Sequence, residues 1–490
     1  MNKYINKYNN YILAIVFFLI ILIIIYYINN FFIETKYSDI LCVGAGVSSA
    51  YMCYKFKKNN INNNIIVIEK EQILGGRLNS VYTNNVNQNI PEVVFNELGA
   101  MRLFKGEEMK IIFELLEELN LQTINVPIKD ENNIFYYKGQ HIRKSDVLIN
   151  NKKVKDFEND MIDRFKKTNP TFNYANTYEF EELCNISLRS FFKKYGNATD
   201  NDVDLWITYS GYNLYSDDVS VSNWLFDKDF YNSKNSDNQV YLKDGMSSLA
   251  KNLFKYSNAN IFYNTKVMNV EKNKDGIFLV HTLNNKHKYI CYKCKYLVLG
   301  MGSSDLLELN TIKKLPISNE RIEMIKYIKP FPLFKCFLKW DFDKIWWGKN
   351  KEFSQGKTTT DLIVRQVHYY NDEDILIYNS NNYAKKLYDI FNENSANGIL
   401  TVYNDIKEIH NIDIPEPNFN YVLYKYWKEG SHKWKIGSDI LLFTKNIPDG
   451  KTDKSNIYIV GDSFSEFQGW IIGAIKSVDI AFEKLQKEFI

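Results

Sequence analysis

The chain has 490 residues, and its 45% hydrophobic and 15% aromatic content is ample for packed cores in two or three domains. Lys and Arg number 61 against 58 Asp and Glu, so the net charge of +3 excludes the basic footprint of a nucleic-acid-binding protein. Among the six histidines and six cysteines, Cys291 and Cys294 have the C-x-x-C spacing of metal ligands, but no second cysteine pair or histidine pair follows, and we expect no metal centre.

The first predicted element is an uncharged segment, Tyr11 to Ile28, which contains no Asn, Gln, Gly or Pro. At about 1.5 Å per residue, a helix of this length nearly spans a hydrocarbon core of ~30 Å. We therefore predict a single transmembrane helix, with residues 1–36 as an anchor in a lipid bilayer. The alternative is a cleaved signal peptide, although no small-x-small cleavage site follows. Lys3 and Lys7 favour a cytosolic N-terminus, which would place the rest on the lumenal or extracytoplasmic side.

Residues 39–50 predict a strand, a glycine turn and a helix start. The apolar run from Ile40 to Val43 is typical of a buried parallel strand. Gly44 permits the tight turn, Gly46 lets the backbone approach a pyrophosphate, and Ser49 keeps the third position small. The free N–H groups of the helix start would then face the phosphates, so the pattern predicts a dinucleotide site.

A second strand, residues 65–68, ends at Glu69, whose carboxylate would accept hydrogen bonds from an adenosine ribose. Residues 457–474, near the other end of the chain, predict another buried strand, a polar turn and a helix start. If both ends of a long chain hold one dinucleotide, the cofactor domain is discontinuous, which points to a flavin enzyme.

Further segments stand in order between these ends: Gly75-Gly76-Arg77, Glu97 to Arg102, Lys243 to Leu249, Asn264 to Val267, Phe334 to Trp340 and Gly356 to Tyr370. The ordered set resembles the flavin-containing amine oxidase superfamily over nearly everything after residue 38. The last segment resembles its L-amino-acid oxidase branch. The resemblance implies FAD as cofactor, oxidation of a C–N bond, and dioxygen as electron acceptor.

The resemblance also implies an α/β fold with a discontinuous Rossmann-type FAD-binding domain, a mixed-sheet substrate domain and a helical insertion. We expect the FAD-binding domain at 37–105, 236–302 and 451–490, the substrate domain at 106–139 and 303–450, and the insertion at 140–235.

The same resemblance assigns residues to the cofactor: Gly44, Gly46, Ser49, Glu69, Gly76, Arg77, Gly99, Ala100, Met101, Val267, Gly461, Asp462, Gly469, Trp470 and Ile471. Asp462 stands where the family usually has Glu. Its shorter side chain would need help from backbone or water to serve the ribityl hydroxyls.

Arg102 is the principal candidate for substrate binding. A guanidinium binds a carboxylate at two points and is always charged, and the resemblance assigns Arg102 to the substrate carboxylate. The alternative is a structural arginine paired to Glu97 or to the cofactor. Tyr369 is matched to a carboxylate-binding tyrosine of the amino-acid oxidase branch, with His368 or Tyr370 as alternatives.

Lys335 is the principal catalytic candidate, because the family's lysine holds a water near the flavin and assists its reoxidation; Lys339 in the same predicted strand is the competitor. Trp470 would form an aromatic wall beside the substrate amine, which an aromatic face favours electrostatically. Trp427 matches another tryptophan of that site, although the small Gly-Ala pair that usually follows is not evident.

The leading hypothesis is an FAD-dependent oxidase that removes a hydride from the α-carbon of an amine, an L-amino acid by resemblance. The products would be an imine, then a 2-oxo acid, ammonia and hydrogen peroxide. The alternatives are a monoamine or polyamine oxidase, and a membrane-anchored flavoprotein without turnover. The sequence leaves the side chain of the substrate and the oligomeric state open.

Overall fold

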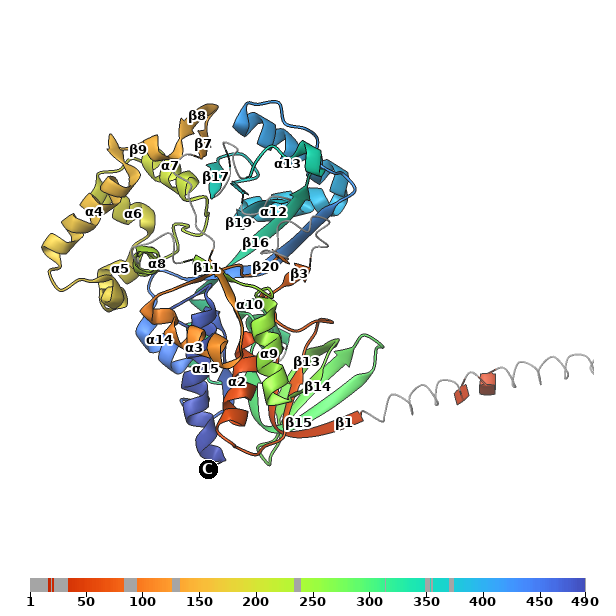
Figure 1. The fold of residues 1–490 in the computed structure, drawn as a ribbon. Coiled ribbons are helices and arrows are strands. Elements are labelled where there is room, and N and C mark those ends of the chain that lie inside the picture. The colour runs from red at the N-terminus through yellow and green to blue at the C-terminus, as the bar shows by residue number, and fades with distance from the viewer. Residues whose placement is uncertain are drawn as a thin grey trace, which may run out of the picture.

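The computed structural model describes residues 16–18, 20–21, 34–82, 95–125, 133–232, 239–312, 314–348, 353, 356–369 and 374–489. These residues form a mixed α/β fold with two seven-stranded sheets and a separate group of helices (Figure 1).

The first sheet collects strands from three distant stretches of the chain. Its order is β12-β2-β1-β15-β14-β13, and β21 pairs with β15. The strands are β1 (Glu34–Val43), β2 (Ile65–Ile68), β12 (Asn260–Phe262), β13 (Thr265–Lys272), β14 (Phe278–Asn284), β15 (Tyr289–Leu299) and β21 (Ile457–Ile459). Strands β12, β2, β1, β15 and β21 run parallel to one another. Strands β14 and β13 continue the sheet beyond β15 in antiparallel pairs. This sheet therefore brings both ends of the described chain together.

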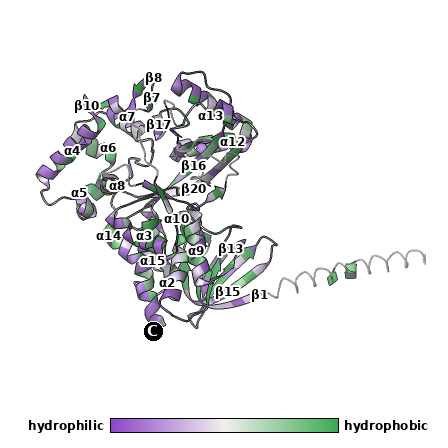
Figure 2. Cartoon of the chain, in the orientation of Figure 1, coloured by the Kyte–Doolittle hydropathy of each residue, from purple (hydrophilic) through white to green (hydrophobic). Residues whose placement is uncertain are grey.

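Alternate side chains of β1 serve two separate cores, as a parallel strand covered on both faces requires. Ile40 and Cys42 belong to the cluster under α2 (Val47–Lys58), α9 (Ser247–Ser257) and α15 (Ile471–Leu485). Leu41 and Val43 belong to the opposite cluster, under α10 (Ser303–Ile312), α11 (Asn319–Lys326) and α14 (Ile440–Asn446). Figure 2 shows hydrophilic and hydrophobic residues on the same helices, as one buried face per helix predicts.

The second sheet has the order β20-β16-β19-β18-β17-β7-β8. Its strands are β7 (Ile134–Tyr137), β8 (Gln140–Arg143), β16 (Ile328–Lys339), β17 (Lys357–Thr360), β18 (Gln366–His368), β19 (Asp374–Ser380) and β20 (Val422–Trp434). Helices α12 (Asn381–Glu393) and α13 (Ser395–His410) cover one face. Strands β16 and β20 form a long antiparallel pair. Ile328, the first residue of β16, and Trp434, the last residue of β20, are paired and belong to a core of the first sheet.

Two small sheets of short strands lie between the two large sheets. Strands β3 (Ser80–Tyr82) and β4 (Phe95–Glu97) make one ladder, and β5 (Leu103–Phe104), β11 (Gln239–Leu242) and β6 (Thr123–Asn125) make another. Two helical pieces, η1 (Glu107–Met109) and α3 (Lys110–Glu118), follow β5. The loop between β4 and β5, residues 98–102, therefore lies at the junction where the sequence places several site residues.

The separate helices are α4 (Val154–Thr168), α5 (Glu181–Asn185), α6 (Leu188–Gly196), α7 (Asp200–Ser210) and α8 (Ser222–Asn232). They share a core of their own, which is rich in Phe and Trp. The caps explain their limits: Thr199 and Asp202 form a capping box at the start of α7, and Gly211 with φ of +79° ends it. The chain that leaves this C-cap carries Tyr212 toward the second sheet.

The prediction of an N-terminal transmembrane helix is wrong. In the described part of the chain no helix is long and apolar enough to cross a membrane. Most of the run from Tyr11 to Ile28 lies outside the described residues, which include only 16–18 and 20–21 of it. The predicted contact with a lipid bilayer and the single-pass location with an extracytoplasmic catalytic part are therefore unsupported. They rested on the hydropathy of one segment and, for the orientation, on the charges of Lys3 and Lys7.

Candidate cofactor and active site

The turn after β1 is possible only with glycine at its first position. Gly44 has a φ of +92°, and a methyl group there would lie 2.6 Å from the carbonyl oxygen of Gly300. The backbone N–H of Gly44 donates to the carbonyl oxygen of Ile68 (2.8 Å), and that of Gly300 donates to the carbonyl oxygen of Val43 (2.8 Å). The turn is therefore held by the ends of both neighbouring strands, β2 and β15. The glycine therefore serves close packing of three backbone segments.

Gly46 differs from Gly44, because it has ordinary extended dihedrals, φ −79° and ψ 179°. A methyl group at Gly46 would meet no atom within 4 Å, so open space lies before the N-terminus of α2. Ser49, one turn into that helix, is fully buried, and its hydroxyl oxygen has no hydrogen-bond partner among the described residues. That hydroxyl faces Gly300, where an added methyl group would lie 2.8 Å from it, so the small side chain serves close packing of α2 on the strand ends. The open cradle before the N-terminus of α2 fits a bound phosphate group.

Glu69 closes the same turn from the end of β2. Its carboxylate accepts hydrogen bonds from the backbone N–H groups of Ala45 (2.7 Å) and Glu71 (2.9 Å). The backbone N–H of Thr265 donates to the carbonyl oxygen of Glu69 (2.7 Å). The start of β13, with the partly buried Val267, therefore lies next to the end of β2. Each carboxylate oxygen keeps a further lone pair, so Glu69 can also accept from ribose hydroxyls.

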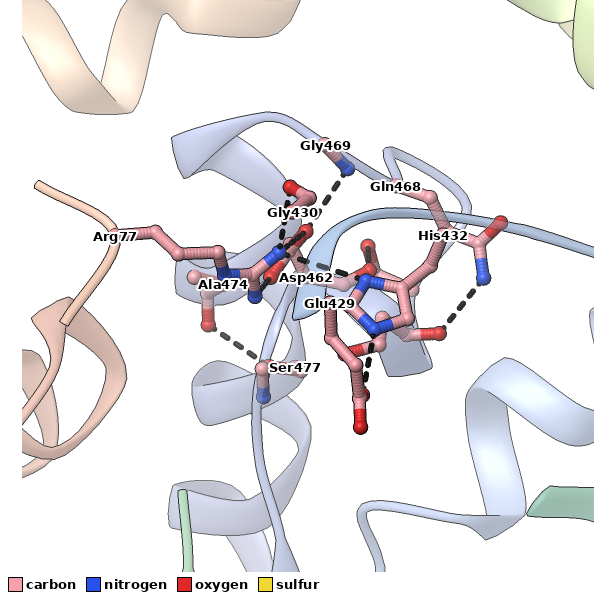
Figure 3. A network of polar contacts seen from close by, with 12 residues as sticks. Arg77, Glu429, Gly430, His432, Asp462, Gln468, Gly469, Ala474 and Ser477 are labelled. Atoms are coloured by element: carbon pink, nitrogen blue, oxygen red, sulfur yellow. Dashed lines mark hydrogen bonds and ion pairs between the residues drawn. The ribbon is translucent and has the colours of Figure 1, made fainter. Parts of the chain in front are cut away.

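Arg77 and Asp462, which the sequence assigns separately to the cofactor, form an ion pair with each other (Figure 3). Arg77 Nη1 donates to Asp462 Oδ2 (3.1 Å), Nη2 donates to Oδ1, and the backbone N–H of Gly469 also donates to Oδ2 (2.9 Å). Burial acts to raise the pKa of Asp462, but the charge and hydrogen bonds of Arg77 and the backbone N–H of Gly469 together with the nearby His432 outweigh it, and the pKa is lowered. The shorter acid is thus stabilised by a guanidinium and a backbone amide.

Three more cofactor candidates adjoin this pair. Gly76 has a φ of +58° and stands directly before Arg77, and Gly461, with a φ of +152°, stands directly before Asp462. Ile471 is the first residue of α15 and follows the N-cap Trp470. The C-terminal motif therefore faces the Gly75–Arg77 segment across the N-terminus of a helix.

The loop 98–102 packs tightly onto the Arg77 segment. A methyl group at Gly99 would lie 1.9 Å from the carbonyl oxygen of Arg77, and the backbone N–H of Ala100 donates to that same oxygen (2.9 Å). Only glycine permits this approach. The loop and the cofactor turn are therefore one unit, and residues 99–101 are presented toward the second sheet.

Lys335 reaches this loop from β16. Its Nζ donates to the carbonyl oxygens of Glu97 (3.0 Å) and Gly99 (2.5 Å) and contacts Met101 Sδ (3.3 Å). Burial lowers the pKa of Lys335, although the charge of Glu97 opposes the shift. Burial likewise raises the pKa of the Glu97 carboxyl group, which accepts from Ser80 and from the backbone of Met246. The competitor Lys339, the last residue of β16, lies over the ring of Tyr421 instead.

Arg102 lies among aromatic rings from the other parts of the molecule. Its Nη2 donates to the hydroxyl of Tyr212 (3.4 Å), and the Tyr212 ring lies 5.8 Å from that of Tyr378 on β19. Lys335 Nζ lies 5.0 Å from the centre of the Tyr378 ring, because the two residues are cross-strand neighbours. Gln366 fixes the Tyr212 loop by donating to the Gly211 carbonyl (2.8 Å).

The two predicted tryptophans flank the same loop. Trp427 on β20 donates its indole N–H to the Leu98 carbonyl (2.6 Å). The ring of Trp470 packs edge-on against Phe104, at 5.2 Å between centroids. Residues Arg102, Lys335, Trp427 and Trp470, which are far apart in sequence, are thus gathered around residues 98–104.

Tyr369 is placed elsewhere. Its hydroxyl group contacts Thr358 (3.2 Å) and His410 in the core under α13. The preceding residue, His368, lies on the side of Tyr378, with 6.2 Å between ring centroids. Burial, followed by the charges of Lys357 and Arg102, holds the pKa of His368 well below its usual range. Of the alternatives left open at 368–370, the structure favours His368; Tyr370 lies outside the described residues.

Sequence reasoning missed Tyr212 and Tyr378, and no local pattern marks either residue. It also overlooked Gly430-Ser431, the small pair that comes three residues after Trp427. The carbonyl oxygen of Gly430 accepts from Arg77 Nη1 (3.4 Å), so this stretch of β20 borders the cofactor arginine. The short spacing from Trp427 could have identified the pair.

Within the described ranges, no group of three or more His, Cys, Asp or Glu residues could hold a metal ion, and the six cysteines are unpaired. The open cradle at Gly46, the Glu69 carboxylate and the Arg77 guanidinium instead suit the pyrophosphate and ribose of an adenine dinucleotide. The residues present therefore fit FAD.

The sequence matches the family described as flavin containing amine oxidoreductase over residues 54–478. A curated relative, the uncharacterized protein R188 of Acanthamoeba polyphaga mimivirus, is 26% identical over 487 residues, which cover 90% of this chain and 92% of the relative. The family match extends from helix α2 to helix α15, and so takes in the loop 98–102, β16 and β20.

The two glycines of the first turn predict opposite outcomes for one substitution. Gly46→Ala should cost at most about 1 kcal/mol of unfolding free energy, the usual cost of alanine at an N-cap. It should weaken FAD binding roughly tenfold or more, because its methyl group fills the cradle. Gly44→Ala should lower the free energy of unfolding by about 2 kcal/mol or more, since alanine is strained at the positive φ of this position and its methyl group collides with the carbonyl oxygen of Gly300.

Thermal unfolding of the cofactor-free proteins and titration with FAD measure the two effects separately. If Gly46→Ala binds FAD as tightly as the wild type, the cradle does not hold the pyrophosphate.

Proposed function

The chain belongs to the flavin-containing amine oxidoreductase family, and on this premise we propose that it is an FAD-dependent oxidase of L-amino acids. Membership implies a flavin cofactor and an amine substrate. The finer assignment, an amino acid with its α-carboxylate, is supported chiefly by one observation. Arg102 lies at the hydroxyl of Tyr212, beside Tyr378 and on the loop that Lys335 holds.

Arg102 would bind the substrate carboxylate through two parallel N–H···O bonds, which its planar fork favours over a single contact. The Tyr212 hydroxyl, which accepts from Arg102, can donate its own proton to the same carboxylate. The aromatic rings around this pair limit access of water, which strengthens a charge-assisted contact. Together they would fix the α-carbon in one orientation relative to the loop 98–102.

The charges around the site favour an amino acid over a polyamine. The groups that act most on buried His368 are the cations Lys357, Arg102, Lys335 and Lys144. A polycationic substrate would be repelled by this set, whereas a carboxylate would be attracted. A polyamine oxidase is therefore the weaker alternative, and a monoamine differs from an amino acid at this site only by the missing carboxylate.

Bound FAD would supply the two-electron acceptor for oxidation of the C–N bond and would pass the electrons to dioxygen. The protein supplies orientation and proton handling. Lys335 is held by carbonyl oxygens rather than by a carboxylate, and its lowered pKa suits a group that holds a water and exchanges a proton. Trp470 and Trp427 would confine the amine. The net reaction converts amino acid, water and dioxygen to 2-oxo acid, ammonia and hydrogen peroxide.

The proposal of a flavoprotein without turnover rested on the stretch after Trp427 and on a membrane anchor. Trp427 is hydrogen-bonded to Leu98, and Gly430 contacts Arg77, so that stretch is integrated into the site. The remaining residues of the site have the side chains that the oxidase reaction requires. We therefore favour an active enzyme.

Replacement of Arg102 by alanine should discriminate an amino acid oxidase from an amine oxidase. The kcat/KM for an L-amino acid should fall by about two to three orders of magnitude, because a charge-assisted contact of the half-buried Arg102 is lost. The kcat/KM for the corresponding decarboxylated amine should change little, since that amine has no carboxylate. Peroxide release on matched substrate pairs measures both values.

FAD content must stay normal in the Arg102→Ala protein for this comparison. An equal loss on both substrates would assign Arg102 to the cofactor or the fold, and the amine oxidase alternative would then lead.

Lys335→Met should separate the two half-reactions. Reduction of the bound flavin by substrate should change little, while reoxidation by dioxygen should slow by about tenfold or more, as the loss of a positioned proton donor predicts. Stopped-flow absorbance follows each half-reaction, and Lys339→Met serves as the matched control from the same strand. Unchanged reoxidation in Lys335→Met would remove Lys335 from the catalytic set.

A further inference from the structure

Two side chains of β20, the acidic Glu429 and the basic His432, lie next to Arg77, and neither belongs to the segments that the sequence assigns to FAD. The ring of His432 is fully buried, and its Nδ1 lies 3.4 Å from Arg77 Nη1 (Figure 3). The other ring nitrogen, Nε2, lies 3.2 Å from Glu429 Oε2. The chain Glu429–His432–Arg77–Asp462 therefore links β20 of the second sheet to the segment directly after β21 of the first.

The donors and acceptors in this chain can be assigned from chemistry. A guanidinium has no acceptor and stays protonated, so His432 Nδ1 must accept the hydrogen bond from Arg77. The other ring nitrogen, Nε2, then donates its N–H to the Glu429 carboxylate. In this tautomer every contact is favourable, and the ring orientation is fixed at both ends.

Glu429 is itself anchored to the first sheet's side of the molecule. Its Oε2 accepts from the backbone N–H of Ser304 (3.2 Å), and a methyl group at Gly302 would lie 2.6 Å from that oxygen. Burial acts to raise the pKa of Glu429, but the hydrogen bonds from His432 and Ser304 outweigh it and bring the pKa to about 2. The carboxylate is thus ionised at neutral pH and held at the N-terminus of α10.

We propose that His432 and Glu429 are positioning residues for the cofactor: they orient the guanidinium of Arg77 toward the pyrophosphate of FAD. The inference rests on the proposed FAD site. Asp462 holds Arg77 from the side of α15, and His432 holds it from β20, so the guanidinium is fixed on two sides. The segment that carries it lies beside the open cradle, because the backbone N–H of Gly75 donates to the Ala45 carbonyl oxygen (2.8 Å) and a methyl group at Gly76 would lie 3.4 Å from the Cα atom of Gly46. A side chain fixed before binding loses less conformational entropy when the phosphate arrives.

The test measures the dissociation constant of FAD for cofactor-free protein, with flavin fluorescence as readout. His432→Leu should weaken FAD binding by about tenfold or more, the usual loss for a hydrogen bond to a charged group. His432→Asn should stay within about threefold of the wild type, because its Oδ1 replaces Nδ1 as acceptor for Arg77. His432→Gln places its amide at the position of Nε2 and should bind as weakly as His432→Leu.

Two further proteins exclude a general loss of structure. In the Arg77→Met background, His432→Leu should cause no additional loss of FAD affinity, since the group that it positions is gone. The matched control is His410→Leu, which removes another buried histidine, bonded to Tyr369 and the Ile406 carbonyl. It should lower the melting temperature and leave the FAD dissociation constant unchanged.

An unchanged FAD affinity in His432→Leu, or a loss in His432→Asn as large as that in His432→Leu, would overturn the inference. If His432→Leu does not fold, the comparison of the Asn and Gln variants carries the same test, and equal affinities would overturn it. Failure of the wild type to bind FAD would instead overturn the proposed function, so the two failures are distinguishable.

Discussion

The contact on which the site depends is the one between Lys335 and the backbone carbonyls of Glu97 and Gly99. A buried ammonium is costly unless its hydrogen bonds are satisfied, and here they are satisfied by a loop that belongs to the cofactor turn. The same loop cannot move independently, because Gly99 lies against the Arg77 carbonyl. One buried cation thus fixes the second sheet on the cofactor-binding segment and sets where substrate and flavin would meet.

The long antiparallel pair β16 and β20 carries this constraint through the molecule. β16 supplies Lys335, and β20 supplies Trp427 to the loop and His432 to the cofactor arginine. A site between two sheets is otherwise free to open, since interdomain contacts are commonly small and polar. Here a strand pair enters the core of both sheets, so cofactor orientation and substrate orientation are set by the same elements.

The local parts of the site could be predicted from the sequence. The spacing of their residues indicates the glycine turn, Glu69 and the polar turn at Asp462, since each depends on a backbone geometry that few residues permit. Contacts between distant segments could not be predicted. The ion pair of Arg77 with Asp462 and the position of Tyr212 arise from tertiary packing.

Two differences from the expectations have simple physical causes. Consecutive residues of an extended chain point to opposite faces, so a match that is uncertain by one residue exchanges Tyr369, which contacts Thr358, for His368, which lies on the side of Tyr378. The membrane anchor was inferred from hydropathy alone, and no helix of the described part of the chain is long and apolar enough to support it. Resemblance located the segments, but it did not supply the side-chain directions.

The central claim is that this site oxidises the C–N bond of an L-amino acid with a bound flavin. The most direct measurement is anaerobic mixing of the purified yellow protein with individual L-amino acids, while the flavin absorbance is followed. The account predicts bleaching by at least one amino acid, and, when dioxygen is admitted, return of the colour with one hydrogen peroxide per flavin. A flavin that simple amines reduce but no L-amino acid does, or a folded protein that takes up no flavin, would contradict it.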